Sequence, residues 1–150
     1  MIVIDATNLI SGRMATWVAK QALLGEEINI VNCESAVITG KKKSVLTRYR
    51  EKYEIGDALK GPYFPKMADR FIRRMVRGML PYKQKKGIDA YKRVMCYLGV
   101  PIEFNDKKLE TIKSADVSNS RVLSYITVGD ICKNLKKWKL YIKLEREKLQ

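Results

Sequence analysis

The sequence predicts an α/β fold, in which helices cover a parallel sheet. The observation that indicates this class is the alternation of short apolar runs with longer amphipathic stretches along the chain. A second observation, that 46% of the residues are apolar, indicates that the fold can bury a hydrophobic core. The length of 150 residues fits one domain. We therefore expect residues 1–150 to form a single domain, with a core over about residues 1–140.

The first elements along the chain are a short strand and an amphipathic helix. Residues 2–4 form an apolar run typical of a buried strand. Ser11 is a candidate N-cap for a helix over residues 12–24, where apolar side chains recur at helical spacing until Gly25.

The middle of the chain continues this alternation of strands and helices. Apolar runs predict two strands, at residues 28–31 and 36–38, the second ending at Gly40. Helical spacing and turn residues then predict three helices and a later strand. The helices cover residues 41–53, 67–80 and roughly 88–95, and the strand covers residues 97–100.

The last third of the chain is less regular. Residues 102–126 show too little pattern to predict an element. Residues 127–130 resemble a capping box with Asp130 in the place usually held by Glu or Gln, so a helix is expected to begin there. Residues 133–150 carry a net charge of +5 and are expected to project as an exposed basic helix or tail.

The charge of the chain is large and unevenly distributed. The 30 Lys and Arg residues exceed the 16 acidic residues, which gives a formal net charge of +14. Residues 41–93 alone carry a net charge of +12, whereas residues 1–40 and 94–132 are slightly acidic. A domain with this charge tolerates its own repulsion best when a polyanion neutralises it, so the pattern indicates a localised nucleic-acid footprint.

The sharpest candidate within that segment is an arginine face on the helix over residues 67–80. Arg70, Arg73, Arg74 and Arg77 stand at the spacing that places four side chains on one side of a helix. Phe71, Met75 and Met79 are expected to pack on a core from the opposite side. Such a charge run can also be a solvated surface, but Asp69 is the one acid nearby, and the planar guanidinium group suits phosphate.

Basic residues mixed with aromatic residues follow this helix and could hold phosphates while stacking on bases. Lysines also stand at the start of the helix over residues 41–53, where helix N-termini favour phosphate. The predicted RNA contacts outside the arginine face are Arg13, Lys41, Lys42, Lys43, Arg48, Lys52, Gly78, Lys83, Lys85, Lys86, Tyr91, Lys92 and Arg93.

Several of these residues have an equally ordinary structural explanation. Tyr91 could simply pack at the edge of the core. Gly78 could serve close helix packing, end a helix, or let an RNA backbone come close, and the sequence does not decide among these roles. The extended segment at residues 61–65, which contains two prolines, is expected to be a loop that joins two basic helices.

Enzymatic chemistry finds little support in the residues. The first strand is not followed by GxGxxG, and the sequence around Gly40 lacks the spacing of a phosphate-binding loop. The chain contains no histidine, so Cys33 lacks its usual activating base, and Asp5 is more typical of a capped turn than of a catalytic acid. An enzyme that acts on RNA or on a nucleotide remains the alternative to a structural RNA-binding protein.

No cofactor, metal site or small-molecule substrate is predicted. The three cysteines form no CxxC pair, which argues against zinc and favours reduced, packed thiols. The longest apolar runs are too short to span a membrane, and the start of the chain does not resemble a signal peptide. We therefore expect a cytoplasmic protein that does not bind membranes.

The motifs in order resemble the universal large-subunit ribosomal protein thirteen family. The segments that carry the resemblance are residues 4–6, 11–16, 31–33, 38–42 and, most specifically, Arg74-Met75-Val76-Arg77-Gly78-Met79-Leu80-Pro81. Residues 61–65, 90–93 and 98–101 resemble its archaeal and eukaryotic branch. The resemblance runs from about residue 2 to residue 101 and can be followed to about residue 140.

This resemblance implies more than the residues alone predict. It implies a three-layer α/β/α fold around a mostly parallel four-stranded sheet. It also implies a structural constituent of the large ribosomal subunit, without enzymatic activity, that binds large-subunit ribosomal RNA, supports subunit assembly and contacts neighbouring ribosomal proteins. The helix that ends in Arg77-Gly78-Met79-Leu80-Pro81, and the basic loop after it, would face the RNA.

Overall fold

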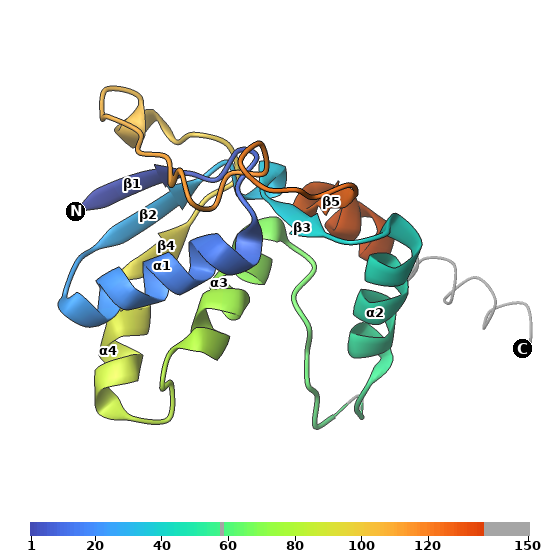
Figure 1. Ribbon diagram of the computed structural model, residues 1–150. Coiled ribbons are helices and arrows are strands. Elements are labelled where there is room, and N and C mark those ends of the chain that lie inside the picture. The colour runs from blue at the N-terminus through green and yellow to red at the C-terminus, as the bar shows by residue number, and fades with distance from the viewer. Residues whose placement is uncertain (58, 137–150) are drawn as a thin grey trace, which may run out of the picture.

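The computed structural model describes residues 1–57 and 59–136, which form a mixed α/β fold (Figure 1). The strands are β1 (Ile2–Asp5), β2 (Ile28–Val31), β3 (Val37–Thr39), β4 (Val94–Cys96) and β5 (Tyr125–Thr127). The α-helices are α1 (Ser11–Leu24), α2 (Lys42–Glu54), α3 (Ala68–Met79) and α4 (Lys85–Lys92), and residues 128–136 are also helical. Two short 3-10 turns are η1 (Cys33–Ser35) and η2 (Ile102–Phe104).

A parallel sheet with the strand order β1-β2-β4 organises the molecule. Both crossovers step across the sheet in the same direction, and right-handed crossovers therefore place their helices on the same face. Figure 1 shows α1, α3 and α4 together on one side of the sheet. Ile4, Ile28 and Ile30 point to this side, where they form one core with Met14 of α1 and Phe71 of α3.

The opposite face of the sheet differs from the predicted three-layer α/β/α fold, which would place helices there. Val3 and Val31 pack there against Phe104 of η2 and against Tyr97, whose ring centroid lies 5.4 Å from that of Phe104. Among the described residues this second face is covered by the segment around η2, with no α-helix packed on it. The described part of the fold thus has its helical layer on one side.

The four-stranded parallel sheet that the family resemblance implied is not what the structure shows. Three strands are parallel, whereas β3 pairs antiparallel with β5 in a second, two-stranded sheet. A parallel neighbour of β2 needs a crossover of a dozen residues or more, and only residues 32–36 separate β2 from β3. The strand β3 instead continues beside Ile10, through an isolated parallel bridge to Val37.

Several element boundaries also differ from the sequence-based prediction. Ser11 is the first residue of α1 and not its N-cap, because its hydroxyl donates to the carbonyl of Val37 at 2.8 Å. The strand predicted at residues 97–100 is wrong: the strand is β4, whose Val94 pairs with Ile28, and α4 lies three residues earlier than expected. Gly99, at φ +63°, turns the chain just after it.

The C-terminal predictions are met in part. The backbone N–H of Asp130 donates to Thr127 Oγ1 at 3.2 Å, so Thr127 caps the helix at residues 128–136 as expected. The strand β5 was not predicted, since it is a three-residue run inside an otherwise unpatterned segment. Most of the basic segment predicted at residues 133–150 lies outside the described residues.

Candidate nucleic-acid interface

The helix α3 has one buried side and one cationic side. Its buried residues are Ala68, Phe71, Ile72 and Val76, while the four arginines occupy the opposite side. Phe71 packs in the core as expected, Met75 is half-buried, and Met79 is 41% exposed, so its predicted core role is wrong. Met79 stands at the last helical position, where its sulfur accepts a hydrogen bond from the Thr16 hydroxyl at 3.4 Å.

The arginine side of α3 forms one wall of a groove of about 690 Å³. The other wall is the extended segment over residues 63–67, which precedes α3, and Tyr91 of α4 also lines the groove. All four predicted arginines line this groove, as does Lys66, which the sequence analysis did not single out. The groove gathers five cations and two tyrosines along one path, which suits an extended polyanion that carries aromatic groups.

Two of the arginines are held in place by tyrosine rings. The guanidinium carbon of Arg73 lies 4.6 Å from the ring centroid of Tyr91, and that of Arg77 lies 5.0 Å from the ring centroid of Tyr82. A guanidinium group stacked on a ring keeps its N–H edges free to donate, so both residues are oriented before a ligand arrives. Tyr91 therefore acts here at least as a support for Arg73.

Acidic side chains do little to neutralise these arginines. Two salt bridges lie away from the groove: one joins the N-terminal amine to Glu26, and the other joins Lys92 to Asp89. Asp69, the acid nearest in sequence, has one buried carboxylate oxygen without a hydrogen-bond partner, and the buried Nε of Arg73 also lacks one. An external anion could satisfy the arginines that the protein leaves uncompensated.

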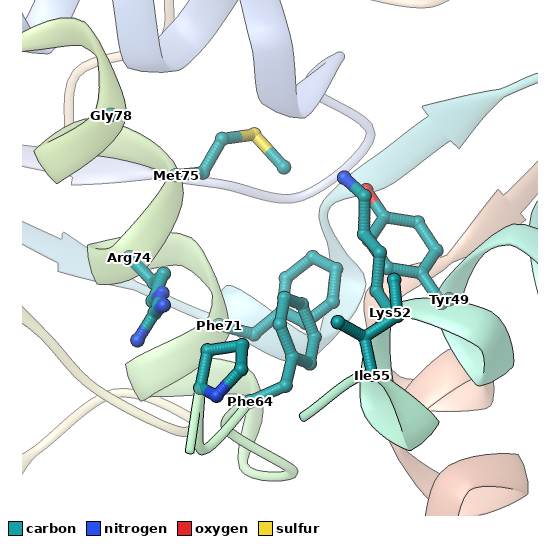
Figure 2. Close-up of a pocket in the computed structure, with 9 residues that line it drawn as sticks. Tyr49, Lys52, Ile55, Phe64, Phe71, Arg74, Met75 and Gly78 are labelled. Atoms are coloured by element: carbon teal, nitrogen blue, oxygen red, sulfur yellow. The ribbon is translucent and has the colours of Figure 1, made fainter. Parts of the chain in front are cut away.

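A smaller pocket of about 380 Å³ lies on the other flank of α3, facing α2 (Figure 2). Its lining is largely apolar and aromatic, with two cations, and comprises Tyr49, Lys52, Ile55, Pro62, Phe64, Phe71, Arg74, Met75 and Gly78. The rings of Tyr49, Phe64 and Phe71 pack against one another with centroids 5.0–5.9 Å apart. This aromatic cluster joins α2 to α3.

Gly78 lines this pocket and is exposed to solvent. A Cβ atom at this position would meet no atom within 4 Å, so the proposed role in close helix packing is wrong. Close packing does require a glycine at position 87, because a Cβ there would overlap the carbonyl of Pro81. Tyr49 and Phe64 were missed in the sequence; the aromatic pair between Pro62 and Pro65 was the available signal.

The remaining predicted contacts are dispersed over the surface. Lys41, Lys42 and Lys43 are exposed at the start of α2, Arg48 is exposed further along it, and Lys83, Lys85 and Lys86 are exposed around the turn into α4. The structure does not bring these residues into the groove. Lys52 alone among the α2 cations lines the pocket.

Three further candidates already have contacts within the protein. Arg93 donates to the carbonyl of Ala22 at 3.2 Å, near the C-terminal end of α1, and Arg13 donates to the carbonyl of Ser114 at 3.4 Å. Lys92 lies 4.0 Å from the carboxylate of Asp89. Both arginines are therefore also structural links between distant parts of the chain.

The residues weighed for catalysis have structural roles. Asp5 accepts hydrogen bonds from Thr7 and Asn32, as expected of a capped turn. Although partial burial raises the pKa of Asp5, these hydrogen bonds lower it below its usual value overall. Cys33 and Cys132 are buried and Cys96 is partly buried, and all three are free thiols.

Comparison with known proteins agrees with the motifs. The family described as "Ribosomal protein L13" matches residues 1–103. The chain belongs to the ribosomal protein L13 family. Proteins named "Large ribosomal subunit protein uL13" from Methanosarcina barkeri and Methanococcoides burtonii are 48% and 44% identical to it, over 90% of this chain and 97% of each relative.

A third relative of the same name, from Archaeoglobus fulgidus, is 45% identical over 89% of this chain and 86% of its own length. The resemblance to the ribosomal protein L13 family is thus confirmed over most of the chain, and these relatives are archaeal. None of the described helices is long and apolar enough to cross a membrane.

Proposed function

We propose that this chain is a structural constituent of the large ribosomal subunit and binds large-subunit ribosomal RNA through the groove on α3. Its L13 relatives carry the name of a large-subunit protein, and the family is a structural, non-enzymatic class. The observation that carries the proposal is the groove, where Arg70, Arg73, Arg74 and Arg77 lie on one side of α3. On this proposal the protein works in the cytoplasm, within the ribosome, and supports subunit assembly beside neighbouring ribosomal proteins.

The other exposed cations extend the proposed contact. Lys83, Lys85 and Lys86 continue from the C-terminal end of α3, and Lys41, Lys42 and Lys43 add charge at the start of α2. Their separation from the groove indicates that they would reach other phosphates of a folded RNA. Phosphate contacts of this kind position a protein on RNA, while bases that reach a pocket give specificity.

The test replaces the four groove arginines together with Gln. Gln is nearly as good a helix former as Arg, and the buried side of α3 is untouched, so the fold should remain. If two of the four contacts are desolvated, at about 1.5–3 kcal/mol each, affinity for a large-subunit ribosomal RNA fragment should fall on the order of 100-fold or more. Circular dichroism and a binding titration measure both effects.

A matched control removes the same charge elsewhere. Lys107, Lys108, Lys113 and Arg121 are exposed and lie in the slightly acidic part of the chain. Replacing these four with Gln lowers the net charge equally but leaves the groove intact. If both variants bind equally well, or if the groove variant folds and binds like the parent, the arginine face is a solvated surface and the proposal is wrong.

A further inference from the structure

The pocket between α2 and α3 has a chemistry that the arginine groove does not explain. We propose that it receives one unpaired nucleobase of the bound RNA. This inference rests on the proposed function, because it assigns a specific contact within the same RNA interface. The pocket volume of about 380 Å³ lies in the range of small-ligand sites, roughly 300–1,000 Å³.

The shape and polarity of the lining suit a flat group with a polar edge. Figure 2 shows the rings of Phe64 and Phe71 side by side between α3 and α2, with Met75 on the α3 side. Phe64 stands edge-on to Phe71, at 85° between ring planes. Aromatic and sulfur-bearing surfaces stack well on the face of a base, whatever its identity.

The Tyr49 phenol is the uncharged polar side-chain group of the lining that can meet the edge of a base. Tyr49 is only 9% exposed, and in Figure 2 its hydroxyl points to the same side as the ammonium group of Lys52. Burial raises the pKa of Tyr49, although the charge of Arg48 opposes this, so the phenol is protonated and can both donate and accept at neutral pH.

The charges around the pocket favour a ligand that carries negative charge. Lys52 and Arg74 stand on opposite sides of it, on α2 and α3, and none of the nine lining residues is acidic. This lining therefore suits a flat apolar group that is attached to an anion, and a nucleotide has both parts, a base and a phosphate. An apolar protein side chain would leave both cations without a counter-charge.

The pocket is continuous with the groove. Arg74 and Phe64 line both, Arg74 from α3 and Phe64 from the segment that forms the outer wall. A strand whose phosphates follow the arginines therefore passes the mouth of the pocket, and a single base could turn inward while its phosphate remains on Arg74. Gly78 leaves room at this mouth, since no atom beyond its chain neighbours and the backbone of its own helix lies within 4 Å of where its Cβ would be.

The test fills the pocket mouth without removing a charge. Gly78→Leu adds bulk at the lining and improves helix propensity, so the protein should stay folded. Affinity for the ribosomal RNA fragment should fall about five- to 150-fold, the factor equivalent to base–aromatic stacking of roughly 1–3 kcal/mol. The salt dependence should not change, because no phosphate contact is lost. Gly12→Leu is the matched control: it places Leu at another helical glycine with open space and should bind like the parent.

A second measurement uses the parent protein and altered RNA. Each unpaired nucleotide of the fragment is replaced in turn by an abasic one. One position should weaken binding by a similar factor, and the same replacement should have no further effect on Gly78→Leu, as expected for two changes that remove one contact. This result would also show that the loss in Gly78→Leu is not caused by misfolding.

The outcomes separate this inference from the proposed function. If the four-Gln groove variant loses binding but no abasic position matters, or Gly78→Leu binds like the parent, the pocket holds no base and the groove stands. An unaffected groove variant would instead overturn the proposed function. Loss of binding in Gly78→Leu without a sensitive abasic position would mean that the RNA backbone, and no base, passes Gly78.

Discussion

Gly87 shows how one missing side chain fixes the position of a helix. It lies in the first turn of α4, and a Cβ there would overlap the backbone of Pro81, which cannot move independently of the turn. Gly87→Ala should therefore lower the free energy of unfolding by about 1–3 kcal/mol, as overpacking does. Urea unfolding measures the loss, with Gly12→Ala as a glycine replacement that meets no neighbour. Equal stability of the two variants would contradict this account.

Tyr91 offers a test of orientation at the level of a single ring. Tyr91→Phe keeps a ring under the guanidinium group of Arg73, whereas Tyr91→Leu removes the ring and with it the cation–π contact. Affinity for RNA should fall by a few-fold in the Leu variant, corresponding to about 0.5–1 kcal/mol. The Phe variant should bind nearly like the parent, and an equal loss in both would show that the Tyr91 hydroxyl itself contacts RNA.

The thiol of Cys132 should make the folded protein less stable as the pH rises into the alkaline range. Burial, opposed by Lys136 and reinforced by Asp69, raises the pKa of the Cys132 thiol from 9.0 to about 11. Below pH 9 the thiol is protonated in both the folded and the unfolded protein. Above pH 9 the thiol ionises first in the unfolded protein, so the contribution of Cys132 to stability is lost as the pH rises toward 11. The difference in unfolding free energy between the parent and Cys132→Ala should shrink between pH 8 and pH 11; a constant difference would contradict the raised pKa.

At the scale of an element, α3 has a sharp boundary between its two sides. Val76 is fully buried, and Val76→Asp places an unpaired charge in the core, which should unfold the protein. Met79→Asp, one turn later and 41% exposed, should leave the far-ultraviolet circular dichroism of the folded protein unchanged. A folded Val76→Asp variant would mean that α3 is not anchored through this side.

The elements also show what the sequence could and could not predict. The helices α1, α2 and α3 were predicted nearly correctly, because their apolar residues repeat at helical spacing. The strands β4 and β5 have three residues each, too few for a periodic signal, and their positions depend on pairing with distant strands. The strand β3 was predicted within one residue of its place, whereas the four-stranded sheet implied by the family resemblance was not found, because the short link after β2 does not allow a parallel neighbour.

The candidate site also has a part that the sequence could predict and a part that it could not. The arginine face could be predicted because i, i+3, i+4 and i+7 spacing is a local property of one helix. The pocket could not be predicted, since it joins Tyr49 of α2, Phe64 of the connecting segment and Gly78 of α3 only after folding. The contacts of Arg13 and Arg93 within the protein were likewise invisible, because their acceptors lie 101 and 71 residues away.

For the whole molecule, the concentration of charge predicts how RNA binding responds to salt. If about six to eight phosphates are contacted, the logarithm of the affinity should fall with the logarithm of the salt concentration at a slope of roughly −4 to −7. A titration of a large-subunit ribosomal RNA fragment at several salt concentrations measures the slope. The four-Gln groove variant should have a shallower slope than the parent, and a parent slope near zero would contradict a phosphate-led contact.

Helix α2 has few buried residues, and this should make the free protein sensitive to proteolysis. Only Val45 and Tyr49 of its thirteen residues are buried, so α2 should unfold locally at a lower free-energy cost than the core helices. Local unfolding exposes the backbone of α2 to proteases. Degradation of unassembled copies should therefore begin within residues 42–57. RNA that bridges Lys52 and Arg74 would tie α2 to α3 and slow this cleavage, so that incorporation into a particle would itself protect the chain from turnover.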